Sequence, residues 1–220
     1  MSEAVNVSGL WQCPAESQAC LVFAHGAGAG MDHPFMAAVA GGLEVMGFAT
    51  LRYQFPYMES RSKRPDPPGL CHATVRAAVA AARELVPSLP LFAGGKSFGG
   101  RMTSQAQASS PLPRVHGIGF LGFPLHPPKE PSIARAEHLF KIKIPLLFLQ
   151  GARDAFADSA LLQPLVNELG PAATLTLFED ADHSFHVPVR SGRRDAQVHA
   201  EMLHALAHWM RSTMAAARTR

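Results

Sequence analysis

The sequence has few cysteines, few charged residues and no long apolar run, and each shortage excludes a class of protein. Three cysteines occur, Cys13, Cys20 and Cys71. An odd number without metal-type spacing argues against a disulfide framework and against a zinc site. No apolar run reaches the roughly 18 residues of a transmembrane helix, so no membrane span is expected. Residues 1–10 lack the basic segment and apolar core of a secretory signal, which predicts a cytoplasmic protein.

Charge is sparse and nearly balanced. Charged residues make up 17% of the chain, and the net charge is +3. The basic residues form short clusters, such as residues 61–64 and 190–194, with no aromatic residues between them. This pattern predicts a solvated surface and no nucleic-acid partner. The 47% hydrophobic content is that of a globular protein, and 220 residues without an internal repeat predict a single domain over residues 1–220.

Short apolar runs alternate with helical segments along the chain. We predict strands at residues 19–24, 48–55, 89–93, 115–123, 144–150 and 174–178, and helices at residues 34–46, 71–86, 98–109, 133–140, 159–169 and 194–214. Unbroken apolar strands separated by helices indicate an α/β fold, a mostly parallel sheet with helices on both faces. The proline-rich residues 65–69 are not expected to be regular. Ligands of such sheets bind beyond the carboxyl ends of the strands.

One predicted strand runs into residues 95–99, which have the form Gly-x-Ser-x-Gly. Between an apolar strand and a helix, this pattern predicts a nucleophile elbow, in which Ser97 sits on a sharp turn with its hydroxyl exposed. Glycines are needed because the strand and the helix lie close together. Since roughly one chain in ten of this length matches the pattern by chance, the interpretation requires a base, an acid and an oxyanion hole elsewhere in the sequence.

A serine hydroxyl becomes a good nucleophile when a histidine takes its proton and a carboxylate orients that histidine. In sheets that carry such an elbow, these residues follow in the order serine, acid, histidine. Asp154 comes just after the strand at residues 144–150, and His183 comes just after the strand at residues 174–178. We therefore predict Ser97, Asp154 and His183 as catalytic residues.

Each of the last two assignments has an alternative nearby. Asp158 also lies near a strand end, but it precedes a predicted helix, where a capping role is common. His186 is farther from its strand end than His183 and stands next to residues 187–188, Val-Pro. We favour Asp154 and His183 for these reasons.

An oxyanion hole needs two backbone N–H groups aimed at the developing negative charge. Phe98, directly after the serine, is expected to supply one of them. The second is expected from residues 25–28, which follow the strand at residues 19–24; Ala27 is the first choice and Gly28 the second. The alternative is a glycine-rich turn that only leads the chain into a helix, and both interpretations can hold together.

Two nucleotide-binding interpretations of these glycines fail on the sequence. Residues 95–97, Gly-Lys-Ser, match the end of a phosphate-binding loop, but Pro90 stands where that motif requires glycine. Residues 26–28 match part of a dinucleotide fingerprint, but Met31 stands at the third glycine position and no acidic residue ends the next strand near Arg52. No nucleotide cofactor is expected.

Four residues beside these motifs have open roles. Asp32 and His33 are expected to cap the following helix, and the alternative is that His33 lines the substrate entrance. Lys96 and Arg101 flank the serine and either attract an anionic substrate or form structural ion pairs. Four histidines lack a recognised ligand pattern, so no metal ion is expected: His25, His33, His183 and His186.

Together these segments resemble the compact α/β-hydrolases related to dienelactone hydrolase, and most closely the group that includes the testis-expressed and NSL-complex-subunit hydrolase-like proteins. The likeness is carried by residues 25–34, 94–101, 122–128, 149–154 and 182–185. It implies the α/β-hydrolase fold without a large cap, and a Ser97–Asp154–His183 triad. Dienelactone hydrolase itself has a cysteine nucleophile, so the serine here departs from it and leaves ester chemistry open.

The expected function is a serine hydrolase that acts on an ester, thioester or lactone of a small acyl substrate through an acyl-enzyme. Residues 56–69 and 124–143 are expected to form the pocket walls. Gly28, His33 and Phe123 are expected to contact the substrate. The alternatives are a non-catalytic interaction module with the same fold, and an acyltransferase or peptidase with the same triad.

Overall fold

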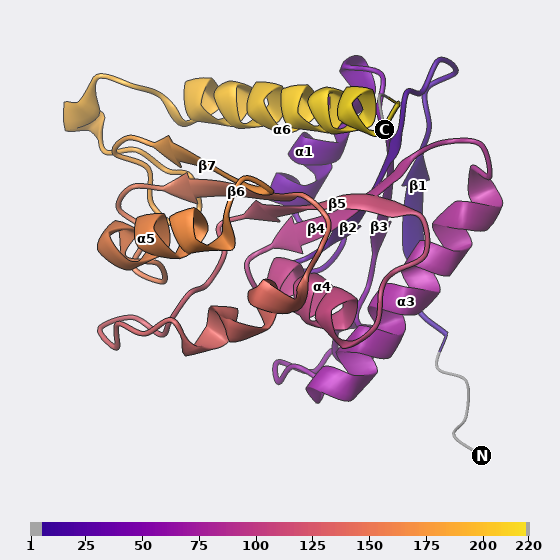
Figure 1. Cartoon of the computed structure of the whole chain (residues 1–220), viewed down its shortest axis with the longest axis horizontal. Helices are drawn as coiled ribbons and strands as arrows, with labels where there is room; N and C mark the ends of the chain where they lie inside the picture. Colours follow the sequence, from indigo (N-terminus) through magenta and orange to yellow (C-terminus); the bar gives the residue numbers. More distant parts are fainter. Residues whose placement is uncertain (1–5, 219–220) are drawn as a thin grey trace.

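The structure, a computed structural model, describes residues 6–218 and is built around one seven-stranded sheet (Figure 1). The strands are β1 (Gly9–Gln12), β2 (Cys20–Ala24), β3 (Ala49–Tyr53), β4 (Leu91–Lys96), β5 (Val115–Leu121), β6 (Leu146–Gly151) and β7 (Ala173–Phe178). Their order in the sheet is β1-β3-β2-β4-β5-β6-β7. β1 pairs antiparallel to β3, and all other pairs are parallel. The carboxyl ends of β2 to β7 therefore meet at one edge, as predicted.

Helices cover both faces of the sheet. They are α1 (Pro34–Val45), α2 (Pro56–Glu59), α3 (Pro68–Leu85), α4 (Phe98–Ser109), α5 (Ser159–Leu169) and α6 (Asp195–Arg218), with 3₁₀ helices η1 (Ala134–Lys141) and η2 (Val189–Ser191). α1 and α6 lie on one face, and α3, α4, η1 and α5 lie on the other (Figure 1). Within residues 6–218, no helix is both long and apolar enough to cross a membrane.

The central strands explain why the apolar runs of the sequence do not alternate with polar residues. All five residues of β2 are buried. Leu21 and Phe23 pack in the cluster beneath α1 and α6, while Cys20, Val22 and Ala24 pack beneath α3 and α4. A strand covered on both faces has no solvent side, so each of its residues is apolar.

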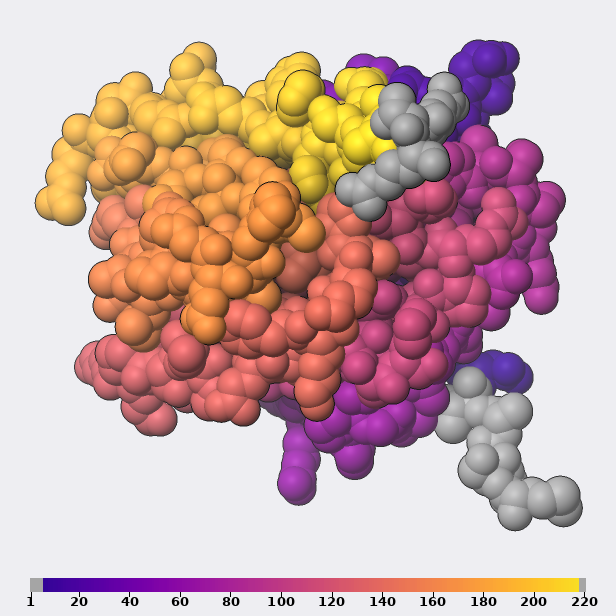
Figure 2. All heavy atoms as spheres, viewed as in Figure 1, coloured from indigo at the N-terminus to yellow at the C-terminus, as the bar shows by residue number. Residues whose placement is uncertain are grey.

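The described part of the chain carries no large cap over the sheet edge. In the space-filling view, the yellow residues of α6 lie directly against the orange residues that precede them (Figure 2). Three connections at the carboxyl edge are longer than the other loops there: residues 54–67 contain α2, residues 122–145 contain η1, and residues 179–194 contain η2. The site at this edge is therefore formed by loops and helix ends.

The predicted strands and helices are present, and the structure also has two short helices that the sequence did not predict, α2 and η2. The prediction differs from the structure at other places as well. α3 begins at Pro68, so the prediction that residues 65–69 are irregular is wrong for residues 68 and 69. Proline suits the first turn of a helix because its φ is already fixed. Residues 134–141 form a 3₁₀ helix. β1 was not predicted, since its four residues form a partly exposed edge strand that only the pairing with β3 defines.

Candidate active site

Ser97 sits at the junction of β4 and α4. It is the N-cap residue of α4 and has φ 50° and ψ −116°. A positive φ is strained for a residue with a side chain, and such strain persists only where the surroundings hold it. The Ser97 N–H donates to the Leu121 carbonyl at 3.1 Å, which fixes the turn against β5.

The glycines around Ser97 are required by close backbone contacts. A Cβ on Gly95 would lie 2.6 Å from the Ala24 carbonyl oxygen, and a Cβ on Gly99 would lie 2.5 Å from the His25 carbonyl oxygen. These neighbours are main-chain atoms of β2 and its loop and cannot move aside. The Gly-x-Ser-x-Gly pattern is therefore the sequence form of a tight β4–α4 junction beside β2.

The three residues predicted as nucleophile, base and acid form one chain of hydrogen bonds. His183 Nε2 lies 2.8 Å from Ser97 Oγ, and His183 Nδ1 lies 2.6 Å from Asp154 Oδ2. They come from the carboxyl ends of three strands, β4, β6 and β7. The Asp154 side chain is fully buried, whereas the His183 side chain is 19% exposed. The carboxylate is thus shielded from water while the imidazole faces the solvent side of the site.

Asp154 is held by two further donors that the sequence analysis missed. Gln150 Nε2 donates to Asp154 Oδ2, and the Phe156 N–H donates to Oδ1 at 2.7 Å. Gln150 is itself buried and accepts from the Phe123 N–H at 2.8 Å. Its signal in the sequence is a lone polar residue at the end of an apolar strand. The Phe156 ring lies 4.6 Å from the His183 ring, so the same turn supports both acid and base.

The competing residues are engaged elsewhere. Asp158 is the N-cap of α5, where its Oδ1 accepts from the Ala160 N–H at 2.8 Å. His186 Nδ1 lies 2.6 Å from Asp195 Oδ2, at the start of α6. The structure therefore brings Asp154 and His183 to Ser97, and neither of these alternatives.

The loop after β2 is anchored by residues that follow β3. His25 Nε2 accepts from the Phe55 N–H at 3.0 Å, so its proton is on Nδ1, which donates to the Gly26 carbonyl at 2.8 Å. Burial lowers the pKa of His25 and keeps the ring neutral. The Tyr57 hydroxyl donates to the Ala27 carbonyl at 2.9 Å. These bonds give the loop one fixed position beside Ser97.

The residues expected to form the oxyanion hole lie beside the serine. Phe98 is the first residue of α4, where N–H groups lack an acceptor within the helix. Ala27 and Gly28 line the same cleft as Ser97. The geometry is compatible with an oxyanion hole made by Phe98 with either of these two residues.

A cleft of about 790 Å³ opens over Ser97 and His183. Its apolar wall comes from the first turns of α1 and from the loop after β6: Pro34, Phe35, Met36, Ala38 and Phe156. Its polar lining includes His33, Ser184, His186, His199 and Lys96. A cleft of this volume suits a small organic molecule. The contributions of Phe35 and His199 had no signal in the sequence, since they depend on how α1 and α6 pack.

His33 has the expected capping role and lies in the cleft lining, while its contact with a substrate stays a prediction. It is the N-cap of α1, where its Nδ1 accepts from the Phe35 N–H at 3.2 Å, and it lines the cleft. The N-cap of α1 is His33, so the expectation that Asp32 also caps this helix is wrong.

The expectation that Phe123 contacts the substrate is wrong. Its side chain is completely buried in the core and is absent from the cleft lining. Its ring lies 5.1 Å from that of Phe120 and 5.8 Å from that of Phe148. The chain turns inward after Gly122, which has a left-handed φ of 74°, so the next side chain points into the core.

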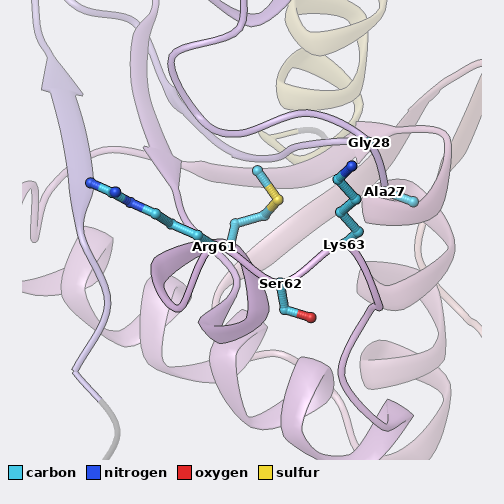
Figure 3. Close-up of a pocket in the computed structure, with 6 residues that line it drawn as sticks. Ala27, Gly28, Arg61, Ser62 and Lys63 are labelled. Carbon is cyan, nitrogen blue, oxygen red and sulfur yellow. The ribbon is translucent and has the colours of Figure 1, made fainter.

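The pocket walls also differ from those expected. Residues 124–143 line separate hollows and not this cleft. Residues 56–69 line a neighbouring hollow of about 450 Å³, which shares Ala27 and Gly28 with the cleft. Figure 3 shows the Lys63 side chain extending toward these two residues and the Arg61 side chain extending away from them.

Neither cation beside the serine forms an ion pair with any residue between 6 and 218. Lys96 Nζ donates to the His183 carbonyl at 2.5 Å. The Arg101 guanidinium lies 6.0 Å from the centre of the Phe98 ring. In the described part of the chain, no group of three or more histidine, cysteine or acidic residues is arranged to hold a metal ion.

Comparison with known families and structures agrees with this architecture. The family described as alpha/beta hydrolase domain matches residues 17–211. A dienelactone hydrolase from Anabaena variabilis superposes with a TM-score of 0.77 at 20% identity, over 96% of this chain and 93% of that one. A serine hydrolase without a lid from Xanthomonas campestris superposes with a TM-score of 0.71 at 18% identity, over 92% and 89%. A monoacylglycerol lipase from Paleococcus ferrophilus gives 0.71 at 16% identity, over 95% and 100%.

Proposed function

Because the chain belongs to the alpha/beta hydrolase domain family, we propose that it is a serine hydrolase that cleaves an ester, thioester or lactone of a small acyl substrate. The observation that carries the proposal is the continuous hydrogen-bond chain from Ser97 Oγ through His183 to Asp154. A buried carboxylate, an imidazole and a hydroxyl in this order are the components of nucleophilic acyl transfer. The strained position of Ser97 beside an open cleft supports the same role.

In the proposed reaction, Ser97 Oγ attacks the acyl carbonyl carbon while its proton passes to His183 Nε2. Asp154 stabilises the resulting imidazolium and holds its tautomer. The Phe98 and Ala27 N–H groups donate to the oxyanion of the tetrahedral intermediate. The intermediate collapses when His183 donates the proton to the leaving group, and this leaves an ester on Ser97. Water, activated by His183, then attacks the acyl-enzyme and releases the acid.

The cleft supports small acyl groups with an apolar part. Its wall is formed by Phe35, Met36 and Phe156, and an open cleft of about 790 Å³ excludes neither an alkyl nor an aryl group. The similar structures include a dienelactone hydrolase and a monoacylglycerol lipase. Lactones and short glycerol esters are therefore suitable members of a first substrate panel.

The test is covalent labelling of Ser97 with a fluorophosphonate probe, followed by peptide mass spectrometry. We expect one adduct, on Ser97, and a loss of ester turnover by roughly 10⁶-fold in Ser97→Ala. Ser184→Ala is the matched control, since Ser184 lines the same cleft outside the hydrogen-bond chain. This control should keep both the adduct and the turnover.

An unlabelled Ser97, together with no turnover of a panel of p-nitrophenyl esters, thioesters and lactones, would overturn the proposal in favour of an interaction module. Normal turnover by Ser97→Ala would overturn the role of this serine alone.

A further inference from the structure

Lys96 is a partly buried cation that the proposed mechanism does not use. It is the last residue of β4 and directly precedes Ser97. Its Nζ donates to the main-chain carbonyl of His183 at 2.5 Å. The same ammonium lies 5.8 Å from the centre of the Phe35 ring and 5.6 Å from that of Phe185. The side chain thus links the strand that carries the nucleophile to the loop that carries the base.

Placing the Lys96 ammonium in this partly buried space costs free energy, because the charge loses contact with water. Burial away from water disfavours the charged form and lowers the pKa of Lys96 to about 8, although the carboxylates of Asp154 and Asp182 oppose the shift. No carboxylate between residues 6 and 218 forms an ion pair with it. An apolar side chain of similar length would avoid this cost. The charge is therefore best explained by the carbonyl that it binds.

The space for this contact is made by Gly122. A Cβ on Gly122 would lie 2.9 Å from Lys96 Nζ, 3.3 Å from the His183 carbonyl oxygen and 3.4 Å from His183 Cε1. The Lys96 ammonium, the His183 carbonyl and the His183 imidazole therefore all lie close to Gly122, which has no side chain. Gly122 also has a left-handed φ of 74°, so a side chain there would be strained as well as crowded.

The turn that carries His183 is also held by hydrogen bonds on either side of the His183 carbonyl, and the Phe185 N–H donates to the Asp182 carbonyl at 3.0 Å. Asp182 Oδ1 accepts from the N–H groups of Ser184 and His186, at 2.8 and 3.0 Å. The Asp182 N–H donates to the His186 carbonyl at 2.9 Å. The His183 carbonyl, which points toward β4, is bound by Lys96.

We propose that Lys96 is a positioning residue, whose ammonium clamps the His183 carbonyl to the end of β4 and so holds the imidazole within hydrogen-bonding distance of Ser97 Oγ. The inference rests on the proposed function, because it requires His183 to be the base. A hydrogen bond from a charged donor is about twice as strong as a neutral one. A displacement of about 1 Å at a catalytic group can lower the rate by about 10²-fold.

The clamp predicts a pH dependence that a purely structural lysine would not produce. The charged groups acting on Lys96 are Asp154, beyond β6, and Asp182, beyond β7. His183 and the cleft histidines His33, on the α1 side, and His199, on α6, also face this region. As the pH rises through about 8, Lys96 loses its proton and the charged hydrogen bond is lost. The reactivity of Ser97 should then fall.

The experiment measures the second-order rate constant for fluorophosphonate labelling of Ser97 from pH 6.5 to 10. This readout needs no knowledge of the substrate. Wild type should label more slowly above pH 8. Lys96→Met and Lys96→Gln should label about 10²-fold more slowly at pH 7, without the fall above pH 8. Lys96→Arg should keep more reactivity than either and lose the fall, because a guanidinium stays protonated. Lys143→Met, at an exposed lysine before β6, is the control and should match wild type.

Folding is checked by thermal melting of the same variants. The unfolded chain binds more protons than the folded one between pH 8 and the ordinary lysine pKa of 10.5, so the wild-type unfolding free energy gains from this group as the pH rises through that window. Lys96→Met lacks the gain and should melt at or above the wild-type temperature at pH 7. Slow labelling by a stable variant would then reflect position and not unfolding.

Wild-type labelling rates in Lys96→Met, or an unchanged fall above pH 8 in Lys96→Met or Lys96→Arg, would overturn the clamp and leave the proposed function standing. An inert Ser97 in the wild type would overturn both.

Discussion

At the scale of single residues, two aspartates that lie four positions apart in the sequence have different roles. Asp154 is buried and accepts from His183, Gln150 and Phe156. Asp158 accepts from the Ala160 N–H at the start of α5. The two carboxylates follow the same strand, and only their donors distinguish an orienting acid from a helix cap.

We predict that Asp154→Asn lowers ester turnover by about 10⁴-fold, because an amide at this position favours the wrong tautomer of His183. Asp158→Asn is the matched control. Asparagine caps helices as well as aspartate does, so this variant should keep its turnover. The measurement is kcat on a p-nitrophenyl ester, with thermal melting to show that both variants fold. A larger loss in the Asp158 variant would mean that the acid is misassigned.

Capping by Asp158 gives a second prediction at this scale. Asp158→Ala removes the acceptor for the Ala160 N–H and should lower the unfolding free energy by about 1 kcal/mol. Urea titration measures this value. An unchanged unfolding free energy would contradict the capping role, and turnover at low urea should stay near that of wild type.

At the scale of elements, the site depends on how closely α4 approaches β2. The junction has no space for a side chain at Gly95 or Gly99, where every near contact is a main-chain atom. By contrast, a Cβ on Gly41, inside α1, would meet nothing within 4 Å. The same residue type is therefore obligatory at the elbow and replaceable in the middle of a surface helix.

We predict opposite effects for alanine at these two glycines. Gly99→Ala should lower the unfolding free energy by about 1–3 kcal/mol and slow the labelling of Ser97, because the elbow must shift away from His25. Gly41→Ala should raise the unfolding free energy by up to about 1 kcal/mol, since alanine favours the helix. Urea titration of both variants measures the two values. A neutral Gly99→Ala would show that the junction is looser than the structure has it.

At the scale of the whole molecule, two histidines, the buried His25 and the half-buried His138, connect parts that are distant in the sequence. His25 links the end of β2 to the chain after β3. His138 Nε2 lies 2.7 Å from Ser104 Oγ and so joins η1 to α4. Burial, aided by the positive charge of Arg101, lowers the pKa of His138 to about 4. Burial also lowers the pKa of His25.

These shifts predict a loss of stability in mild acid. For His138, the unfolded chain takes up a proton near pH 6.5 and the folded chain only near pH 4. Its contribution to stability is therefore fully present above pH 6.5 and is lost as the pH falls toward 4. We expect the melting temperature to fall across this range, and to fall less in His138→Gln, which cannot take up the proton. An equal fall in both proteins would exclude His138 as a cause.

The order of the strands and helices could be predicted because it depends on local properties of the chain. Strands covered on both faces are almost entirely apolar, as β2 is throughout and β6 is apart from Gln150, and helices lie between them in the sequence. Ser97, Asp154 and His183 each follow a predicted strand, and parallel strands end at the same edge of a sheet, so the sequence predicts that these residues meet. β1 escaped prediction because an edge strand of four residues has too little periodicity to be recognised.

The sequence by itself determined the fold class, the strained elbow at Ser97 and the glycines that surround it, because backbone sterics and burial act on neighbouring residues. Only the tertiary structure decided that Phe123 is in the core, that Gln150 binds Asp154, and that α1 and α6 line the cleft. It also decided the contact between Lys96 and His183, whose positions differ by 87 residues. Such contacts depend on how strands and helices pack, and packing joins residues between which the sequence has no periodic relation.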